Sequence, residues 1–316
     1  MQTSPTLDDI RAAARRIRMG IHRTPILTCR SIDAMVGGNL WFKCENLQRT
    51  GAFKIRGATN AVLSLGDDAA ARGVATHSSG NHGAALAFAA CARGIPAYVV
   101  MPENAPRVKR DAVTGYGARV LLCESTLAAR ERSLAEVVEE TGAVFIPPYN
   151  DERVIAGQAT AALELLQDTS GLDIVMTPIG GGGLTSGTAL VVKALSPGTR
   201  MIAAEPLGAD DAYRSFHAGH IVTVENPTTV ADGLRTSLGD KTFPILREFV
   251  DEVVTVSEEA IIAAMRTIWE RMKILVEPSA AVPLGAILGG DLEVRGKRVG
   301  VVLSGGNVDL DRLPWR

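Results

Sequence analysis

One lysine of this 316-residue chain stands in a context that suits covalent chemistry. Lys54 comes just after a glycine turn and lies between Phe53 and Ile55, at the expected start of a helix. Most lysines are solvated at the protein surface, and an isolated lysine would be interpreted in that way. An amine beside apolar side chains loses hydration, which lowers its pKa and suits it to Schiff-base chemistry. Lys54 is therefore the first candidate for a reactive group.

A polar loop, Ser-Ser-Gly-Asn-His-Gly at residues 78–83, follows a predicted strand and precedes a helix that we expect to begin near Ala84. The first N–H groups of a helix have no partner within it and bind carboxylate or phosphate groups well. Serine and asparagine are also ordinary helix caps, and a histidine here could equally be a buried structural residue. The candidate ligands in the loop are Ser78, Ser79, Asn81 and His82.

Four consecutive glycines at residues 180–183 join a predicted strand to the next helix, where their N–H groups can turn inward onto one phosphate. A flexible linker is the plain alternative. A dinucleotide-binding turn is another, favoured by Glu205 at the end of the next strand, where a ribose-binding acid would lie. The three-glycine pattern of a dinucleotide-binding turn does not fit, however. If Gly181 and Gly183 are its first two glycines, the place of the third glycine is taken by Ser186. We therefore expect a cup for a phosphate monoester.

Two further segments carry side-chain oxygens at the ends of predicted strands. Ser304 follows the strand Val299 to Leu303 and directs a hydroxyl toward the same crevice, although this short turn is weak evidence by itself. Glu205, Asp210 and Asp211 form an acidic cluster that could supply hard oxygen ligands to Mg²⁺ or Ca²⁺. A solvated acidic turn is the commoner meaning of such a cluster.

The secondary-structure elements that position these segments can be predicted from the pattern of residues. The chain alternates short β-branched runs with Ala-rich stretches of helical length. This alternation is typical of βαβ units on a mainly parallel sheet and predicts an α/β fold. Ligands of such sheets bind beyond the C-terminal ends of the strands, so the polar and Gly-rich loops should meet in one crevice. The clearest strands are Val74 to His77, Ala97 to Val100, Arg119 to Leu122, Ile174 to Thr177, Met201 to Ala204 and Val299 to Leu303, and clear helices are Val154 to Gln167 and Glu258 to Arg271.

A break at Pro147 and Pro148 separates the earlier strand and helix units from the later ones, which predicts two lobes with a cleft between them.

The formal charge of -2, without a run of basic residues, argues against a nucleic-acid or membrane partner, so a small molecule is the expected ligand. No apolar stretch is long enough to span a membrane, and the first residues lack the apolar core of a secretory signal. The four cysteines have no zinc or disulfide spacing, which indicates reduced thiols and a cytoplasmic location.

Taken together, these segments resemble the fold-type II enzymes that use pyridoxal 5'-phosphate (PLP), in particular threonine dehydratases, serine racemases and 3-hydroxyaspartate dehydratases. The likeness runs from His22-Arg23-Thr24-Pro25 to Ser304-Gly305-Gly306-Asn307, which is nearly the whole chain. It implies a two-lobed α/β fold of the tryptophan synthase β type, with PLP in the cleft, and a homodimer. Residues 1–72 and 148–316 would form the large PLP-binding domain, and residues 73–147 a small mobile domain.

The same resemblance implies roles for the residues described above. Lys54 would hold PLP as a Schiff base and, once the substrate amine displaces it, would remove the Cα proton. Ser79 would lie on the opposite face of the ring, where racemases of this family exchange a proton, and residues 78–82 would bind the substrate α-carboxylate. The further PLP ligands would be Phe53 beside the ring, Asn81 at the ring hydroxyl, Ser304 at the pyridine nitrogen, and Gly180, Gly181, Gly182 and Gly183 at the phosphate.

A divalent-metal site is also implied. Glu205 and Asp211, with the carbonyl of Ala209, match the metal site of the serine racemase branch. Mg²⁺ is the expected ion, with Ca²⁺ or Mn²⁺ as alternatives. The metal would brace the large lobe rather than react, because the family places it away from the ring.

Arg130 is the best indicator of the substrate. It aligns with an arginine that serine racemases use toward the distal carboxylate of dicarboxylate ligands, whereas threonine dehydratases generally lack a cation there. Alternatively, Arg130 belongs to a solvated helix face, because the run at 130–132 alternates in charge. Thr236 takes the place of a further substrate-facing serine.

These features predict an ammonia-lyase that performs β-elimination on a β-hydroxy amino acid. The substrate they fit best is 3-hydroxyaspartate, which would give iminosuccinate and then oxaloacetate and ammonia. Serine racemization or dehydration is the runner-up, and catabolic threonine dehydration comes third. A nucleotide-dependent oxidoreductase or a non-catalytic ligand-binding module would keep the glycine cup yet have no use for Lys54. Because Lys54 and Ser79 both stand in their full context, we favour the PLP enzyme.

Overall fold

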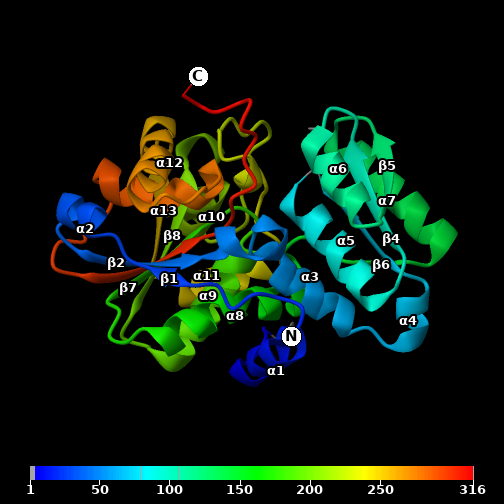
Figure 1. Cartoon of the computed structure of the whole chain (residues 1–316), viewed down its shortest axis with the longest axis horizontal. Coiled ribbons are helices and arrows are strands. Elements are labelled where there is room, and N and C mark those ends of the chain that lie inside the picture. The colour runs from blue at the N-terminus through cyan, green and yellow to red at the C-terminus, as the bar shows by residue number, and fades with distance from the viewer. Residues whose placement is uncertain (1–3, 79, 106, 316) are drawn as a thin grey trace.

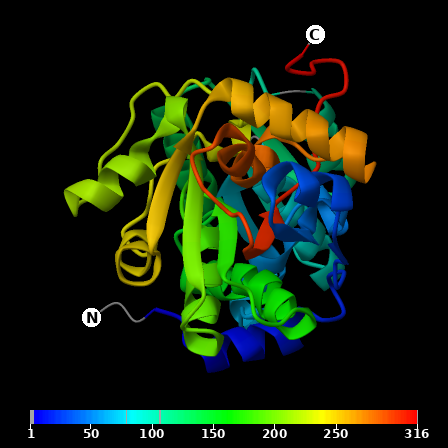
Figure 2. The same cartoon turned by 90° about the vertical axis from the view of Figure 1, so that its left-hand side faces the viewer.

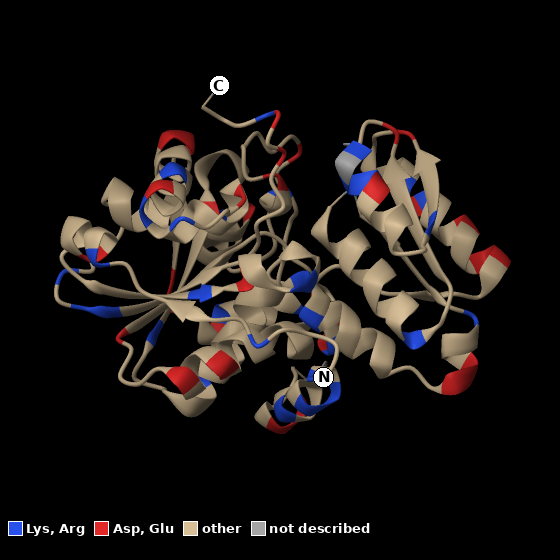
Figure 3. Cartoon of the chain, in the orientation of Figure 1, with Lys and Arg blue, Asp and Glu red and all other residues tan. Residues whose placement is uncertain are grey.

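Two separate β-sheets organise the chain, each inside its own body (Figure 1). The computed structural model describes residues 4–78, 80–105 and 107–315. In Figure 1 the larger body, which carries both termini, lies on the left, and the smaller body, in cyan and green, lies on the right. Acidic and basic residues are interspersed over both bodies (Figure 3). None of the described helices combines the length and the apolar character needed to cross a membrane.

The larger sheet is mostly parallel and is built around the last strand of the chain. In spatial order its strands are β1 (Ile26–Leu27), β2 (Asn39–Cys44), β10 (Arg298–Leu303), β7 (Ile174–Pro178), β8 (Arg200–Pro206) and β9 (Glu252–Val256). β1 is antiparallel to β2, and the other neighbours run parallel. In β10, Val301 lies opposite Phe42 of β2 on one side and opposite Met176 of β7 on the other. The C-terminal strand therefore joins the two halves of this sheet.

Helices cover both faces of the larger sheet, as expected for strands that are buried on both sides. In β7, Ile174 and Met176 pack into the core on one face and Val175 into the core on the other. The first face is covered by α2 (Arg30–Val36), α12 (Glu258–Met272) and α13 (Pro278–Gly289), and the second by α8 (Glu152–Asp168), α9 (Gly183–Leu195), α10 (Asp211–Ala218) and α11 (Thr242–Phe249). α1 (Leu7–Ile17) packs on α8, and Figure 2 shows it at the opposite end of the molecule from the C-terminal segment.

The smaller sheet is parallel and uses strands that follow one another closely in the chain. In spatial order they are β5 (Arg119–Cys123), β4 (Ala97–Pro102), β3 (Val74–His77) and β6 (Val144–Phe145). Val99 of β4 packs with α5 on one face, whereas Val100 packs with α7 on the other. The helices of this body are α4 (Asp67–Ala71), α5 (Asn81–Arg93), α6 (Arg107–Gly115) and α7 (Leu127–Thr141).

α3 (Lys54–Leu63) packs against α5 of the smaller body and against α8 of the larger one. It crosses α8 at very short range: a Cβ on Gly157 would lie 2.6 Å from the Arg56 carbonyl oxygen, and one on Gly57 would lie 2.5 Å from Nε2 of Gln158. Side chains at these two positions would push the helices apart. The crossing therefore fixes the helix that begins with Lys54. Short 3₁₀ helices in the connections are η1 (Glu45–Leu47), η2 (Arg49–Gly51), η3 (Leu207–Ala209) and η4 (Asp232–Leu234).

The strands predicted from the sequence are all present, with ends extended by at most two residues, and the two predicted helices correspond to α8 and α12. The predicted helix start near Ala84 is wrong, because α5 already begins at Asn81. The physical reason is Gly80, whose non-helical backbone, with φ of -147° and ψ of -141°, directly precedes the first helical turn. The strands β1, β2, β6 and β9 were not predicted.

Candidate active site

A cavity of about 1500 Å³ lies between the two bodies and is lined by segments from both. It lies beyond the C-terminal ends of β3, β7 and β10, where the sequence predicted a crevice. The predicted site residues that line it are Phe53, Lys54, Ser78, Asn81, His82, Arg130, Gly180, Gly181, Gly182, Gly183, Asp211, Thr236 and Ser304. Ser79 lies outside the described residues. The fold thus brings together candidates that are far apart in the sequence.

Lys54, the first residue of α3, is surrounded by aromatic and backbone groups. Its Nζ donates a hydrogen bond to the Pro148 carbonyl at 2.7 Å and lies 5.1 Å from the ring centre of Phe53 and 6.0 Å from that of Tyr149. Burial lowers the pKa of the amine to about 8, against the opposing charge of Glu277. Near neutral pH the amine can therefore both lose and accept a proton, as a nucleophile or a general base must.

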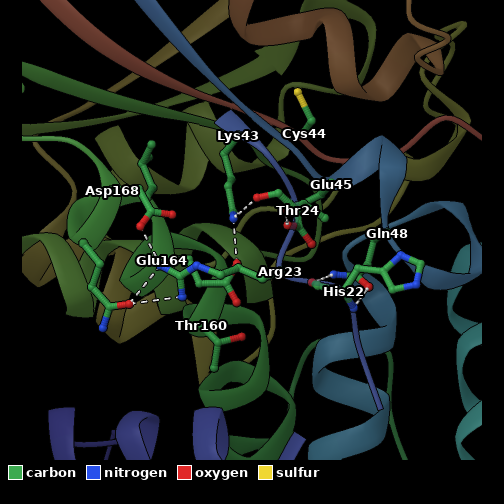
Figure 4. Close-up of polar contacts among 12 residues, drawn as sticks. His22, Arg23, Thr24, Lys43, Cys44, Glu45, Gln48, Thr160, Glu164 and Asp168 are labelled. Carbon is green, nitrogen blue, oxygen red and sulfur yellow. Dashed lines mark hydrogen bonds and ion pairs between the residues drawn. The ribbon is translucent and has the colours of Figure 1, made fainter. Parts of the chain in front are cut away.

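A buried ion network anchors α3 directly after this lysine. Arg56 is fully buried and donates to both carboxylate oxygens of Glu45 and to both of Glu164. Lys43 of β2 completes the network, because its Nζ donates to Glu164 at 2.6 Å and to the Thr24 carbonyl at 2.8 Å (Figure 4). Two cations and two carboxylates balance each other, which is the condition for keeping such charges inside a protein. The network joins β2, η1, α3 and α8.

Side chains of neighbouring segments pack closely against the glycine loop between β7 and α9. Gly182 has a φ of 86°, in the left-handed region that glycine adopts without strain. A Cβ on Gly181 would lie 2.3 Å from Cδ1 of Tyr149, and the Thr242 hydroxyl donates to the Gly181 carbonyl at 2.9 Å. The loop leads into the N-terminus of α9, and the first N–H groups of a helix are suited to bind an anion. This geometry fits the phosphate cup predicted from the sequence.

His82 occupies the first turn of α5 as a buried, neutral ring. Its Nε2 lies 2.9 Å from the Ile146 carbonyl, and because a carbonyl can only accept, we place the ring proton on Nε2. Burial lowers the pKa of His82 to about 3, and Nδ1 has no hydrogen-bond partner among the described residues. A neutral ring does not attract a carboxylate. The N–H groups at the start of α5 are therefore the part of this loop that suits a substrate carboxylate.

Arg130 extends from α7 of the smaller body and lines the cavity together with His77. The His77 ring stacks on Phe145 with a centroid separation of 6.1 Å. Burial lowers the pKa of His77, and the positive charge of Arg130 lowers it further. The Arg130 Nε donates to the Thr126 carbonyl at 3.3 Å, so the side chain is partly held by its own helix. Its neighbour Arg132 is exposed and does not line the cavity. Of the two interpretations left open by the sequence, this position suits the ligand-binding one.

Ser304 and Thr236 lie beside the two loops that meet at the lysine. The Ser304 carbonyl accepts a hydrogen bond from the Phe53 N–H at 3.0 Å, which ties the end of β10 to the residue before Lys54. A Cβ on Gly180 would lie 3.0 Å from Oγ1 of Thr236, so this threonine stands against the glycine loop. The roles predicted for them, Ser304 at the pyridine nitrogen and Thr236 facing the substrate, stay predictions.

Several residues that line the cavity were missed by sequence reasoning. Glu277 is buried, and its two oxygens accept hydrogen bonds from Nδ2 of Asn81 at 2.8 and 3.1 Å. Lys109 of α6 and Asp232 of η4 form an ion pair that links the smaller body to the larger one. Tyr149 packs between Lys54 and the glycine loop. These residues belong to no local motif, and only the folded chain brings them together.

Glu205 and Asp211 form a buried acidic pair. The Glu205 carboxylate, at the end of β8, accepts hydrogen bonds from the N–H groups of Ala212 and Tyr213 at 2.9 and 2.8 Å. Burial raises the pKa of Glu205 to about 9 and that of Asp211 to about 7, and Asp211 Oδ2 has no partner among the described residues. A divalent cation would neutralise both groups and use this free oxygen. Among the described residues no three acidic, His or Cys side chains are placed so that they could hold one metal ion, so carbonyls such as that of the buried Ala209 would complete the coordination.

A cleft between two α/β bodies, lined by a half-buried lysine and by a glycine loop suited to a phosphate, defines an enzyme that binds a phosphorylated carbonyl cofactor. Residues 17–305 match the family model described as "Pyridoxal-phosphate dependent enzyme", so the chain belongs to this family. It is 54% identical over 311 residues to a beta-hydroxyaspartate dehydratase of Paracoccus denitrificans (strain Pd 1222), covering 98% of this chain and 99% of that protein. It is 50% identical over 312 residues to a serine racemase of Dictyostelium discoideum, and this match covers 98% of this chain and 96% of that protein.

The solved structure of maize serine racemase superposes on this chain with a TM-score of 0.96 at 47% identity, covering 98% of this chain and 95% of that one. The predicted fold class is thereby confirmed, namely a fold-type II PLP enzyme with two mostly parallel sheets flanked by helices. The residues present fit PLP, because a half-buried lysine with a lowered pKa and a glycine loop at a helix N-terminus meet the needs of its aldehyde and its phosphate.

Proposed function

We propose that this enzyme eliminates water from a 3-hydroxyaspartate and gives iminosuccinate, which hydrolyses to oxaloacetate and ammonia. The observation that carries the proposal is Arg130 at the cavity wall. Its guanidinium is a permanently charged fork for a second carboxylate, and each charge-assisted hydrogen bond contributes about 1.5 to 3 kcal/mol. The methyl group of threonine would gain nothing from it. The similarity to the dehydratase from Paracoccus supports the same choice.

Bound PLP supplies the electron sink that makes the Cα–H of an amino acid acidic. In this chain Lys54 would hold it covalently, the loop at 180–183 would hold its phosphate, and Asn81 and Ser304 would flank its ring. The Lys54 Nζ, with a pKa of about 8, is suited to accept the Cα proton. The N–H groups at the start of α5 would bind the α-carboxylate and Arg130 the distal one. The substrate would thus be held at both ends while the proton moves to Nζ.

We also propose that Glu205, Asp211 and the carbonyl of Ala209 bind Mg²⁺, with Ca²⁺ or Mn²⁺ as alternatives. The support is the free Oδ2 of Asp211 and the raised pKa of both carboxyl groups, which a cation would lower. A cytoplasmic homodimer remains part of the proposal, and the four cysteines are free thiols in the structure.

The proposed substrate is tested by measuring ammonia and keto-acid release from the 3-hydroxyaspartate stereoisomers, serine and threonine in the presence of Mg²⁺. Wild type is compared with Arg130→Ala and with Arg132→Ala, a matched control at an exposed arginine of the same helix. Arg130→Ala should lower kcat/KM for hydroxyaspartate by about tenfold to 150-fold, which corresponds to the loss of one charge-assisted hydrogen bond, and should change serine turnover far less. Arg132→Ala should behave as wild type.

A preference for serine, with little effect of Arg130→Ala, would instead support the second candidate, a serine racemase or dehydratase. The similarity to the serine racemase of Dictyostelium favours this candidate. Racemization needs a proton donor on the face opposite to Lys54, which is the role predicted for Ser79. A preference for threonine would support a catabolic threonine dehydratase. Each of these outcomes leaves the cofactor assignment unchanged.

A further inference from the structure

Asn307 lies just beyond the end of β10, and its side-chain amide holds the turn that leads to Lys54. Its Nδ2 donates a hydrogen bond to the Thr50 carbonyl at 2.8 Å. Thr50 has a φ of 60°, a conformation that a β-branched residue adopts only where its surroundings fix it. Next to it, the Gly306 N–H donates to the Gly51 carbonyl at 2.9 Å. The segment after β10 is therefore paired with the segment before Lys54.

The same amide nitrogen of Asn307 also reaches the smaller body. It donates its second hydrogen bond, at 2.9 Å, to Oδ1 of Asn81, the first residue of α5. Asn81 Nδ2 in turn donates to the two carboxylate oxygens of Glu277, at 2.8 and 3.1 Å. The Glu277 N–H donates to the Gly305 carbonyl at 3.0 Å, which places this carboxylate beside the end of β10 as well. The Asn81 side chain is thus held between two residues of the larger body.

The partners at the two ends of this series of hydrogen bonds decide which way the Asn81 amide faces. The Thr50 carbonyl can only accept, so the Asn307 atom that contacts it must be the nitrogen. That nitrogen needs an acceptor, which in Asn81 is Oδ1. Asn81 Nδ2 then faces the Glu277 carboxylate, which accepts. Reversing the Asn81 amide would set nitrogen against nitrogen and oxygen against oxygen, so the amide has one orientation.

In this orientation Asn81 presents a donor to the cavity. Asn81 and Glu277 line the cavity, whereas Asn307 does not. Oδ1 of Asn81 is therefore on the side of Asn307, and Nδ2 is on the side of the cavity. An amide nitrogen has two N–H groups, and one of them suffices for the Glu277 carboxylate. The other is left for an acceptor in the cavity, and an oxygen that accepts such a bond is favoured in its ionised form.

We propose that Asn307 is a positioning residue for the cofactor: acting through Asn81, it keeps an N–H donor directed at the ring oxygen of bound PLP. Glu277 supports it from the other side by excluding the reversed amide. A reversed Asn81 would present its carbonyl oxygen, which repels an ionised ring oxygen. The inference rests on the proposed place of Asn81 beside the ring, and it does not depend on which amino acid is the substrate.

The test uses the enzyme with its cofactor and without substrate. The Schiff base of PLP absorbs in the visible when its ring oxygen is ionised and in the near ultraviolet when that oxygen keeps its proton. The ratio of the two bands therefore reports the donor. Asn307→Asp keeps the shape of the side chain but removes both N–H groups, so that Asn81 has an acceptor on each side. The ratio of visible to near-ultraviolet absorbance should fall by about two- to tenfold, the equivalent of one neutral hydrogen bond.

Asn46→Asp is the matched control, because it makes the same chemical change near the same end of β10. Asn46 Nδ2 donates to the Leu275 carbonyl at 2.9 Å, and a Cβ on Gly306 would lie 3.3 Å from the Asn46 Cβ. Urea unfolding should show that Asn46→Asp destabilises the enzyme at least as much as Asn307→Asp does. The ratio of the two bands should nevertheless stay at the wild-type value. Asn307→Ala, which adds no charge, should lower the ratio in the same direction as Asn307→Asp.

Asn81→Ala shows whether this amide contacts the ring, and it should lower the ratio at least as far as Asn307→Asp does. If the ratio falls in Asn81→Ala but keeps its wild-type value in folded Asn307→Asp and Asn307→Ala, the inference is overturned and the proposed place of Asn81 stands. An unchanged ratio in Asn81→Ala would overturn both. An equal fall in Asn46→Asp would also overturn the inference, because the effect would then follow from lost stability.

Discussion

Asp211 has a carboxylate oxygen that is buried without a partner among the described residues, and this residue carries the metal prediction. Mg²⁺ should stabilise the wild-type protein by about 2.7 kcal/mol at a free concentration 100 times Kd, because it binds the folded state and not the unfolded one. Asp211→Asn should lose most of this gain. Thermal unfolding with and without Mg²⁺ measures it. Asp210→Asn is the control, since Asp210 pairs with Arg214 instead, and an equal gain in Asp211→Asn would contradict the site.

Single residues could be predicted from the sequence where the chemistry resides in neighbouring positions. Lys54 between apolar residues and the four glycines after a strand were recognisable in this way. Glu277 was not, because the Asn81 amide that holds it is 196 residues away in the chain. Asp232 and its partner Lys109 are 123 residues apart. A glutamate before a proline has the local pattern of an ordinary helix start, and its burial arises only from tertiary packing.

The helix that begins with Lys54 depends on the buried ion network behind it, and this predicts a large effect of Arg56→Met. Glu45 would remain fully buried without its cation, so the free energy of unfolding should fall by about 3 to 5 kcal/mol. Urea unfolding measures the change. Arg23→Met is the matched control, because it breaks the exposed pair between Arg23 and Asp168 in Figure 4 and should cost at most about 1 kcal/mol. Similar losses in both variants would show that the network does not anchor α3.

The elements that sequence reasoning missed are those whose pattern is overridden by tertiary contacts. β2 contains Lys43 inside its apolar run, and this lysine is buried only because Glu164 and the Thr24 carbonyl receive its hydrogen bonds. β9 begins with Glu252, and β1 and β6 comprise two residues each, which is too short for a periodic signal. The strands with continuous apolar residues, in contrast, were predicted nearly to their ends.

The two bodies are joined across the cavity by the ion pair of Lys109 and Asp232, and we expect this link to contribute to substrate binding in the cleft. A partly exposed ion pair contributes at most about 1 kcal/mol. Lys109→Met should therefore raise KM by up to about fivefold and should change kcat less. Hydrogen exchange of α6 should become faster. The control is Lys193→Met, which breaks a pair with Asp251 inside the larger body. Unchanged exchange in α6 would argue against the pair as a link between the bodies.

The sequence predicted two lobes from a proline break, and the structure has two sheets, one of them formed entirely between residues 74 and 145. How the two bodies face each other could not be predicted. Their relative placement depends on α3, which packs on both, and on the close backbone crossing at Gly57 and Gly157. Such contacts depend on shape across the whole chain rather than on any segment of it.

The position of β10 in the middle of the larger sheet has a consequence for the synthesis of the protein. The smaller sheet has all its strands once residue 145 has left the ribosome, whereas β2 and β7 have no common neighbour until residues 298–303 emerge. At about 5 to 20 residues per second, the growing chain carries these unpaired strand edges for on the order of ten seconds. Open edges pair with other chains. The larger body is therefore the part of the chain that is exposed longest to pairing with other chains while the protein is being made.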